Sequence, residues 1–148
     1  MINVAGITRA IEKTLSLEHK FADVTVVRGD VVNDDPSVAV NGWIGIYRNK
    51  ISYSPHTLGK GGRNWDAEVT IFIVVQMTSF SSGEDCEDRL EELIIDVLTT
   101  VNSNRDIRQT IDMITGLDIT YTYDRDNEES TYYQQAIIEL KGKTGAPR

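Results

Sequence analysis

The residue types that most often supply a nucleophile and its base are scarce in this sequence: one cysteine, Cys86, and two histidines, His19 and His56. Nucleophilic catalysis requires a base beside the nucleophile, and no residue pattern here places the thiol of Cys86 beside an imidazole. Cys86 lies in a run of acidic residues, which raises the pKa of a thiol, whereas a helix N-terminus would lower it. We interpret these residues as one partly buried thiol and two surface imidazoles, not as a Cys–His enzyme.

Two acidic runs have residue types that could bind a metal ion. Asp124, Asp126 and Glu128 alternate as at the start of a calcium loop, but the central glycine and the distal glutamate of that loop are missing. A second run at residues 30–35 is incomplete in the same way. Both runs are typical of solvated turns, so no metal site is predicted. A small metal-dependent hydrolase using the cluster at 124–129 is kept as the alternative from another function class.

A glycine-rich stretch, Gly59-Lys60-Gly61-Gly62, has a composition suited to cradling phosphate. The phosphate-loop pattern, however, requires Gly-Lys-Ser or Gly-Lys-Thr before a helix, and here neither tripeptide occurs and a strand follows. The stretch lies within residues 54–64, which show no periodicity. A loop of this length is uncommon in a compact domain unless it is disordered or functional, so we predict a mobile hairpin tip.

Charge is unevenly distributed along the chain. Residues 41–65 carry four bases and no acid, whereas residues 80–100 carry seven acids against the single base Arg89. Segregated charge orients association more than it adds affinity, so a basic loop suits an acidic partner surface or the acidic helix of a neighbouring copy. The predicted contact loop consists of Arg48, Lys50, Lys60, Gly61, Gly62 and Arg63.

Length and composition narrow the function classes further. The 148 residues match one domain, and 40% hydrophobic with 26% charged residues is ordinary for a folded protein. A formal charge of −8 opposes sequence-independent binding to nucleic-acid backbones. We find no secretory signal and no apolar run of membrane-spanning length, and the single cysteine cannot form an internal disulfide. We therefore expect a soluble protein made in a reducing compartment.

The hydrophobic pattern predicts the elements in the first third of the chain. An opening helix is predicted by apolar residues at steps of three and four: Val4, Ile7, Ile11 and Leu15. The β-branched residues 23–29 predict a strand, followed by turn-forming residues at 30–37. Residues 38–53 are rich in Val, Ile, Trp and Tyr and predict one or two strands, with Asn49-Lys50 as the candidate tight turn.

The clearest strand signal runs from Asp66 to Ser79. A strand that is apolar on both alternating faces is buried on both, by helices on one side and by other material on the second. In a domain with few helices, we expect the second cover to come from another subunit. The candidate oligomer interface is therefore the two-sided apolar centre of this strand: Ile71, Phe72, Ile73, Val74 and Val75.

Two helices are predicted after this strand. An unbroken apolar stripe predicts a long helix from its Ser82 cap to about Asn102, with acids in its first turns that complement the helix dipole. A short helix is expected from Asn104 to about Ile114, with Gly116 at its end.

The last part of the chain predicts a hairpin. Segments 117–123 and 130–141 alternate between apolar and polar residues and are joined by the acidic loop 124–129. We assign residues 1–141 to one domain and residues 142–148 to a disordered tail. The predicted fold class is α+β: a mixed, mainly antiparallel sheet with helices packed on one face and an extended β-hairpin.

The order of several short motifs resembles one known group of proteins. After the opening helix comes a Gly-Trp-Ile-Gly-Ile-Tyr strand, and the stretch Tyr53-Ser54-Pro55-His56-Thr57-Leu58-Gly59 leads into the Gly/Lys/Arg loop. Trp65 begins the long apolar strand, and the final hairpin carries Tyr132-Tyr133 and Ala136-Ile137-Ile138. From about Val4 to Lys141, the chain resembles the tail terminator (tail completion) proteins of long-tailed bacteriophages, the family that includes the lambda-type minor tail protein U.

The resemblance implies a small α+β subunit that closes into a hexameric ring. In that family the ring caps the head-proximal end of the tail tube, stops tube polymerisation and offers a docking surface to the head connector. It therefore implies a structural virion protein of the tail or neck, made in the bacterial host cytoplasm, with no catalysis, cofactor, membrane or sequence-specific nucleic acid. The implied partners are further copies of the chain, the tail tube protein and a head completion or connector protein. An adaptor elsewhere in the phage neck is the alternative within this class.

Overall fold

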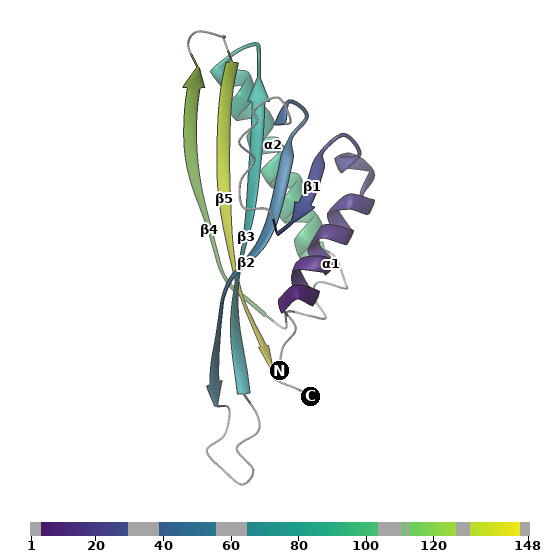
Figure 1. Ribbon diagram of the computed structural model, residues 1–148, viewed down its shortest axis with the longest axis vertical. Helices are drawn as coiled ribbons and strands as arrows, with labels where there is room; N and C mark the ends of the chain where they lie inside the picture. Colours follow the sequence, from purple (N-terminus) through teal and green to yellow (C-terminus); the bar gives the residue numbers. More distant parts are fainter. Residues whose placement is uncertain are drawn as a thin grey trace.

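The computed structural model describes residues 4–29, 39–55, 65–103, 111, 113–126 and 131–145. In these residues, helices pack against one β-sheet, which confirms the predicted α+β class (Figure 1). In chain order the elements are α1 (Val4–Leu17), η1 (a 3-10 turn, His19–Phe21), β1 (Thr25–Arg28), β2 (Trp43–Pro55), β3 (Trp65–Ser79), α2 (Gly83–Ser103), β4 (Met113–Asp126) and β5 (Thr131–Gly145).

The sheet is mixed and mainly antiparallel, as the sequence predicts. Its strand order is β1-β2-β3-β5-β4, so that β1 and β4 are the edge strands. Only the β1–β2 pair is parallel; β2–β3, β3–β5 and β4–β5 are antiparallel. The two edges therefore differ, because β1 is short and β4 is a long strand.

Both helices cover the same face of the sheet and share one hydrophobic core. α1 contacts β1 and β2, whereas α2 contacts β3 and β5. The inward residues of α1 follow the predicted stripe, with Ile11 and Leu15 fully buried. β4 extends past the helical layer at one side of the sheet (Figure 1). The two flanks of the molecule are thus an α1–β1 flank and an α2–β4 flank.

The start of α2 agrees with the predicted cap. The backbone N–H of Asp85 donates to Ser82 Oγ at 3.0 Å, which satisfies one of the helix's unpaired N-terminal donors. The turn before β2 comes close to this helix at Gly42, whose φ is +100°. A Cβ at Gly42 would stand 2.8 Å from Leu93 Cδ2, so the absence of a side chain lets the turn before β2 pack directly under α2.

One predicted turn is wrong. Asn49-Lys50 does not reverse the chain, because β2 continues through it and pairs with β3 on both sides. The register shifts between Arg48 and Lys50, which makes Asn49 a β-bulge that bends a single long strand. Beyond the bulge, β2 and β3 run past the helices as a projecting arm (Figure 1).

Two further boundaries differ from the sequence prediction. Met113 and Ile114 belong to β4, where they pair with β5, and not to the predicted short helix. Residues 104–110 and 112 of that helix lie outside the described residues. Gly142–Gly145, assigned to the tail, extend β5 and pair with β3. In both places, pairing with a strand that is distant in sequence overrides the local sequence pattern. The partner is β5 for Met113 and Ile114, and β3 for residues 142–145.

Candidate functional site

The arm carries basic residues from two strands that are far apart in sequence. Lys50 on β2 pairs with Thr70 on β3, which in turn pairs with Lys141 on β5, so the three lie in one row across the sheet. Lys143 lies two residues further along β5 and therefore on the same face. This face is the one opposite the helices, and we call Lys50, Lys141 and Lys143 the basic row.

The basic row also has acidic neighbours. Lys141 Nζ forms a 3.8 Å ion pair with Glu139, and exposed Glu68 pairs with Lys143 across the strands. Arg48 is exposed. It lies on the face of the sheet that the helices cover, because it pairs with Ile71, which is on that face. On this face the three lysines of the basic row lie beside Glu68, Glu139 and exposed Asp118, which pairs with Glu139, so the row is a local cluster of bases with acids next to it.

The predicted contact loop is therefore only partly placed. Arg48 and Lys50 lie at the root of the arm, and Lys60, Gly61, Gly62 and Arg63 lie outside the described residues. The sequence analysis missed Lys143 because it assigned residues 142–148 to a tail, and it missed Lys141 because the pairing of Lys141 with Thr70 depends on strand register. A usable signal was present: the alternation of Leu140, Lys141, Gly142 and Lys143 continues the period of the strand.

The candidate interface at Ile71–Val75 is covered by the chain itself. Ile71, Ile73 and Val75 lie in the core under the helices, each at most 1% exposed. Val74 points to the opposite face and is fully buried in a second cluster with Ala39 and Trp43. The cover that the sequence analysis expected from another subunit is thus supplied within one chain. A subunit contact through this strand stays a prediction, with Phe72 as the only one of the five that keeps accessible surface.

The second cluster stabilises the face of the sheet that has no helix. Tyr47 and Phe72 meet edge to face there, with ring centroids 5.3 Å apart. Burial raises the pKa of the Tyr47 hydroxyl. Val27, Tyr133 and Ile137 pack against the same cluster. This apolar surface is continuous with the sheet and ends where the basic row begins.

The outer side of α2 is strongly acidic. Exposed Glu84, Glu87, Asp88, Glu91 and Glu92 form no salt bridge with a described base. Arg89 is held elsewhere, because its guanidinium donates to the Val40 carbonyl at 2.6 Å and to the Thr78 carbonyl at 3.3 Å. The negative charge of this helix is therefore left to solvent or to a partner.

A groove of about 500 Å³ follows the seam between α2 and β4. Its apolar lining residues are Leu98, Val101, Ile114, Leu117 and Leu140. Ile114 and Leu117 remain more than 40% exposed, and Ile95 on α2 is 55% exposed. Further along β4, the Tyr121 hydroxyl donates to Glu91 Oε2 at 3.1 Å. The sequence analysis did not identify this α2–β4 seam.

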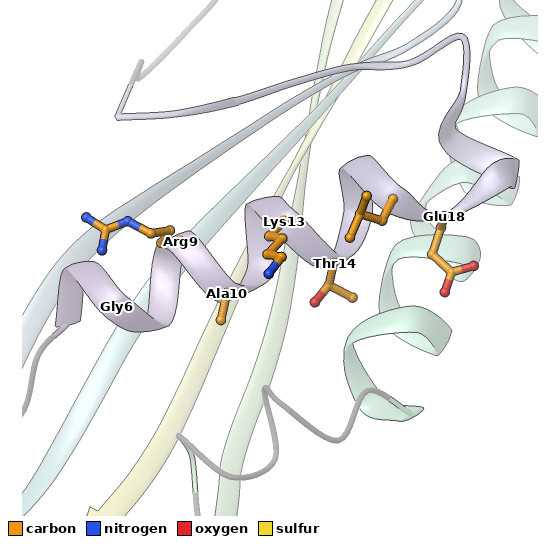
Figure 2. Close-up of a pocket in the computed structure, with 7 residues that line it drawn as sticks. Gly6, Arg9, Ala10, Lys13, Thr14 and Glu18 are labelled. Atoms are coloured by element: carbon orange, nitrogen blue, oxygen red, sulfur yellow. The ribbon is translucent and has the colours of Figure 1, made fainter.

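A second hollow, of about 490 Å³, lies along α1. Gly6, Arg9, Ala10, Lys13, Thr14, Leu17 and Glu18 line it. Figure 2 shows Ala10, Lys13 and Thr14 on one side of the helix, with Glu18 beyond its end. Leu17 is 75% exposed, which makes it the most exposed large apolar residue among those described. The lining of this hollow therefore carries two bases, Arg9 and Lys13, one acid, Glu18, and one exposed leucine.

Cys86 lies buried on the inner side of α2. Its single S–H lies within reach of two carbonyl acceptors, Met77 at 3.3 Å and Tyr132 at 3.5 Å from Sγ. Desolvation by burial is the main cause that raises the pKa of the thiol, which keeps the sulfur protonated. His19 is exposed in η1, and His56 lies outside the described residues. Cys86 thus packs as a core residue.

The acidic runs of the sequence are mostly outside the described residues. Residues 30–35 and 127–130 are not described, and Asp124 and Asp126 are placed in β4 only by their backbone. Among the described residues, no three His, Cys, Asp or Glu side chains gather in a group that could hold a metal ion. Neither α1 nor α2 is long and apolar enough to cross a membrane.

Comparison with known proteins shows a likeness to solved structures. No protein-family model matches the sequence, and no curated protein matches it at a significant level. The chain is similar to a chain in a structure of the virion of a native gene transfer agent particle, with 9% sequence identity and a TM-score of 0.44. The likeness covers 95% of this chain and 97% of the other. A likeness this low does not support any conclusion about function. A proposal about function therefore depends on the surfaces described above and on the sequence motifs.

Proposed function

We propose that this chain is a structural virion protein of a long-tailed bacteriophage. It forms a ring, with six copies as the expected number, at the head-proximal end of the tail tube. There it ends tube growth and offers the surface to which the head is joined. It acts by shape and contact and catalyses no reaction. The sequence resemblance to tail terminator proteins supports this role, and so does the arrangement of charge on the fold.

The observation that carries the proposal is the basic row at the root of the projecting arm. Lys50, Lys141 and Lys143 come together there only because β2, β3 and β5 pair beyond the helices. Of the arm, Val69 joins the core and Ile51 packs against it, so the strands beyond this pair are longer than the core requires. A basic projection on a chain of net charge −8 suits contact with an acidic surface. We assign that surface to the tail tube.

Lys60 and Arg63 extend the same proposal to the tip of the arm. These residues would contact the tube or the adjacent subunit, together with Gly61 and Gly62. The opposite end of the ring would face the head completion or connector protein. An adaptor at another position in the neck would use the same surfaces, and only its binding partner would distinguish it.

The proposal is tested by binding to the ends of purified tail tubes. The double variant Lys50→Glu and Lys143→Glu reverses charge on exposed side chains and should leave folding intact. We expect it to lose binding to tube ends, visible by electron microscopy of labelled protein and by co-sedimentation. Its mass in solution should equal that of the wild type, since Lys50 and Lys143 are assigned to the tail tube and not to the contact between copies.

The matched control is the charge-conserving pair Lys50→Arg and Lys143→Arg, which should bind tube ends as the wild type does. Because electrostatic contacts weaken with salt, binding of the wild type should also fall as ionic strength rises. Undiminished binding of the Glu variant would remove the arm from the proposal. A wild-type protein that binds no tail tube and no connector would contradict the proposed function itself.

A further inference from the structure

The two edges of the sheet are protected to different degrees. β1 is four residues long, and its Arg28 is tied to α1 by a 3.2 Å ion pair with Glu12 and a hydrogen bond to the Ala5 carbonyl. β4 is 14 residues long and forms the left-hand edge in Figure 1. It pairs with β5 alone among the described strands, so one side of its backbone faces no strand in that part of the chain.

β4 also lacks the features that keep sheet edges from pairing with other chains. Those features are a short strand, a lysine or proline on the edge, and a bulge. From Leu117 to Asp126 the register of β4 with β5 is unbroken, and the strand contains neither Lys nor Pro. The β4 edge is therefore open to a further strand.

β4 presents exposed apolar side chains on the side of the sheet that the helices cover. Leu117 and Tyr121 are both exposed. They pair with Leu140 and Ala136 of β5, which belong to the core under the helices. A strand added to β4 would lie about 4.8 Å away, with alternate side chains next to Leu117 and Tyr121. Half of its side chains would thus cover apolar surface that the single chain leaves exposed.

Two contacts place α2 along this part of β4. Leu98 and Leu117 line the same groove, and the Tyr121 hydroxyl donates to Glu91 Oε2 at 3.1 Å. Residue numbers therefore fall along α2 as they rise along β4. At steps of three and four, one stripe of α2 contains Glu84, Glu87, Glu91, Ile95 and Leu98.

This stripe changes from apolar to acidic along the β4 edge. It is apolar where Leu98 lies near Leu117, and it is acidic at Tyr121 and beyond. Its three acids are exposed and form no salt bridge with a described base. A strand beside β4 would therefore meet apolar surface at one end and unneutralised negative charge at the other.

We propose that the β4 edge binds an extended segment of another protein as an added strand. The side chains of this segment on the α2 side are apolar next to Leu117 and basic next to Tyr121, where a lysine or arginine reaches Glu91. Backbone hydrogen bonds to β4 supply the affinity, and the alternate side chains supply the specificity. Antiparallel pairing is the more stable arrangement, so the basic residues come before the apolar ones in the segment.

Charge argues against a second copy of this chain as the occupant. Two β4 strands paired about a two-fold axis would bring two acidic α2 stripes toward each other, and like charges repel. At the other edge of a second copy, Arg28 of β1 is already paired with Glu12. The inference goes beyond the proposed function, because it concerns a surface outside the arm and does not depend on a tail tube.

The probe is a fluorescently labelled peptide with blocked ends, Lys-Thr-Lys-Thr-Val-Thr-Leu-Thr. Its first, third, fifth and seventh residues match the order of charge and apolar surface along α2. Fluorescence anisotropy with the full chain should show saturable binding below about 1 mM. This binding should weaken as ionic strength rises. A peptide with glutamate in place of both lysines should bind at least about 10-fold more weakly.

Two N-methylated forms of the peptide test the strand pairing itself. One carries methyl groups on the amides of the first, third, fifth and seventh residues, and the other on the amides of the threonines. Alternate amides of a strand point in opposite directions, so only one set donates to β4. One form should lose at least about 10-fold in affinity and the other should bind as the unmodified peptide does.

Variants of the full chain locate the binding site. Leu117→Lys places a base in the apolar part of the β4 edge and should weaken binding of the lysine peptide at least about 10-fold. The matched control is Leu17→Lys, the same change at an exposed leucine of α1, which should bind as the wild type does. The double variant Glu87→Lys and Glu91→Lys should prefer the glutamate peptide to the lysine peptide. Circular dichroism verifies the fold of each variant.

Three results would overturn the inference: no saturable binding by the wild type, equal affinities of the two N-methylated peptides, or undiminished binding of the lysine peptide by a folded Leu117→Lys or charge-reversed variant. Self-association of the wild type that Leu117→Lys abolishes would assign the edge to a second copy and would also overturn it. Failure of the proposed function is distinct. A chain that caps tail tubes without binding the peptide keeps the virion role, and one that binds the peptide without capping tubes keeps this contact.

Discussion

The two sides of α2 have opposite relations to the rest of the chain. On the inner side, Leu90, Ile94 and Val97 are at most 1% exposed and pack against the sheet. On the outer side, Ile95 is exposed beside a row of acids that have no salt bridge to a described base. One helix of 21 residues therefore has a packed inner side and an exposed, acidic outer side.

The difference teaches that folding and assembly draw on separate residues of this helix. Inner residues have lost their contact with water in the single chain, so their substitution should change the free energy of unfolding. Outer residues make few contacts within the chain, so their substitution should change association and leave folding nearly intact. Neighbouring positions on α2 allow a direct comparison.

The largest effect is expected for Ile94→Ala. Removing three buried methyl or methylene groups creates a cavity in the core, and we expect the free energy of unfolding to fall by about 2–5 kcal/mol. Urea denaturation followed by circular dichroism measures this change. A loss below about 1 kcal/mol would mean that the inner side of α2 is not packed as described.

A smaller loss is expected for Gly42→Ala, which tests how closely the turn before β2 approaches the inner side of α2. The positive φ of Gly42 is unfavourable for a residue with a side chain, which costs about 1–2 kcal/mol. The added Cβ would also stand 2.8 Å from Leu93 Cδ2. We expect a lower midpoint in urea, and an unchanged midpoint would contradict this close approach.

An effect confined to alkaline pH is expected from Cys86, on the inner side of α2. Burial raises the pKa of its thiol above the ordinary value of 9.0. The unfolded chain therefore loses the thiol proton at lower pH than the folded chain does. This contribution to stability is complete below pH 9 and is lost as pH rises through the higher pKa of the folded state. Denaturation between pH 7 and 11 should show a steeper loss for the wild type than for Cys86→Ala.

The smallest effect on folding is expected for Ile95→Ala, which makes the same chemical change as Ile94→Ala one residue further on. Because Ile95 is exposed, the free energy of unfolding should stay within about 0.5 kcal/mol of the wild type. If Ile95→Ala destabilises the fold as strongly as Ile94→Ala, the distinction between the two sides of the helix fails.

Elements with a strong local pattern were predicted well from the sequence. The apolar stripes of α1 and α2 and the β-branched run of β3 lie within two or three residues of their observed bounds. Each of these elements buries one or both faces, and the spacing of its own apolar residues defines them. The hydrophobic period of the sequence is therefore sufficient to predict these elements.

Features that depend on distant residues were not predictable in this way. Asn49-Lys50 has turn chemistry, but pairing with β3 on both sides makes it a bulge. The basic row joins Lys50 to Lys141 through a strand register that no local pattern specifies. The α2–β4 groove likewise arises only when α2 and β4 are brought side by side.

The account's central claim is that this chain ends the growth of a tail tube. The most direct measurement is the length distribution of tails assembled with and without the protein, recorded by electron microscopy. We predict one uniform length with a ring at one end when the protein is present, and overlong tubes without rings when it is absent. Identical length distributions in the two samples would contradict the claim.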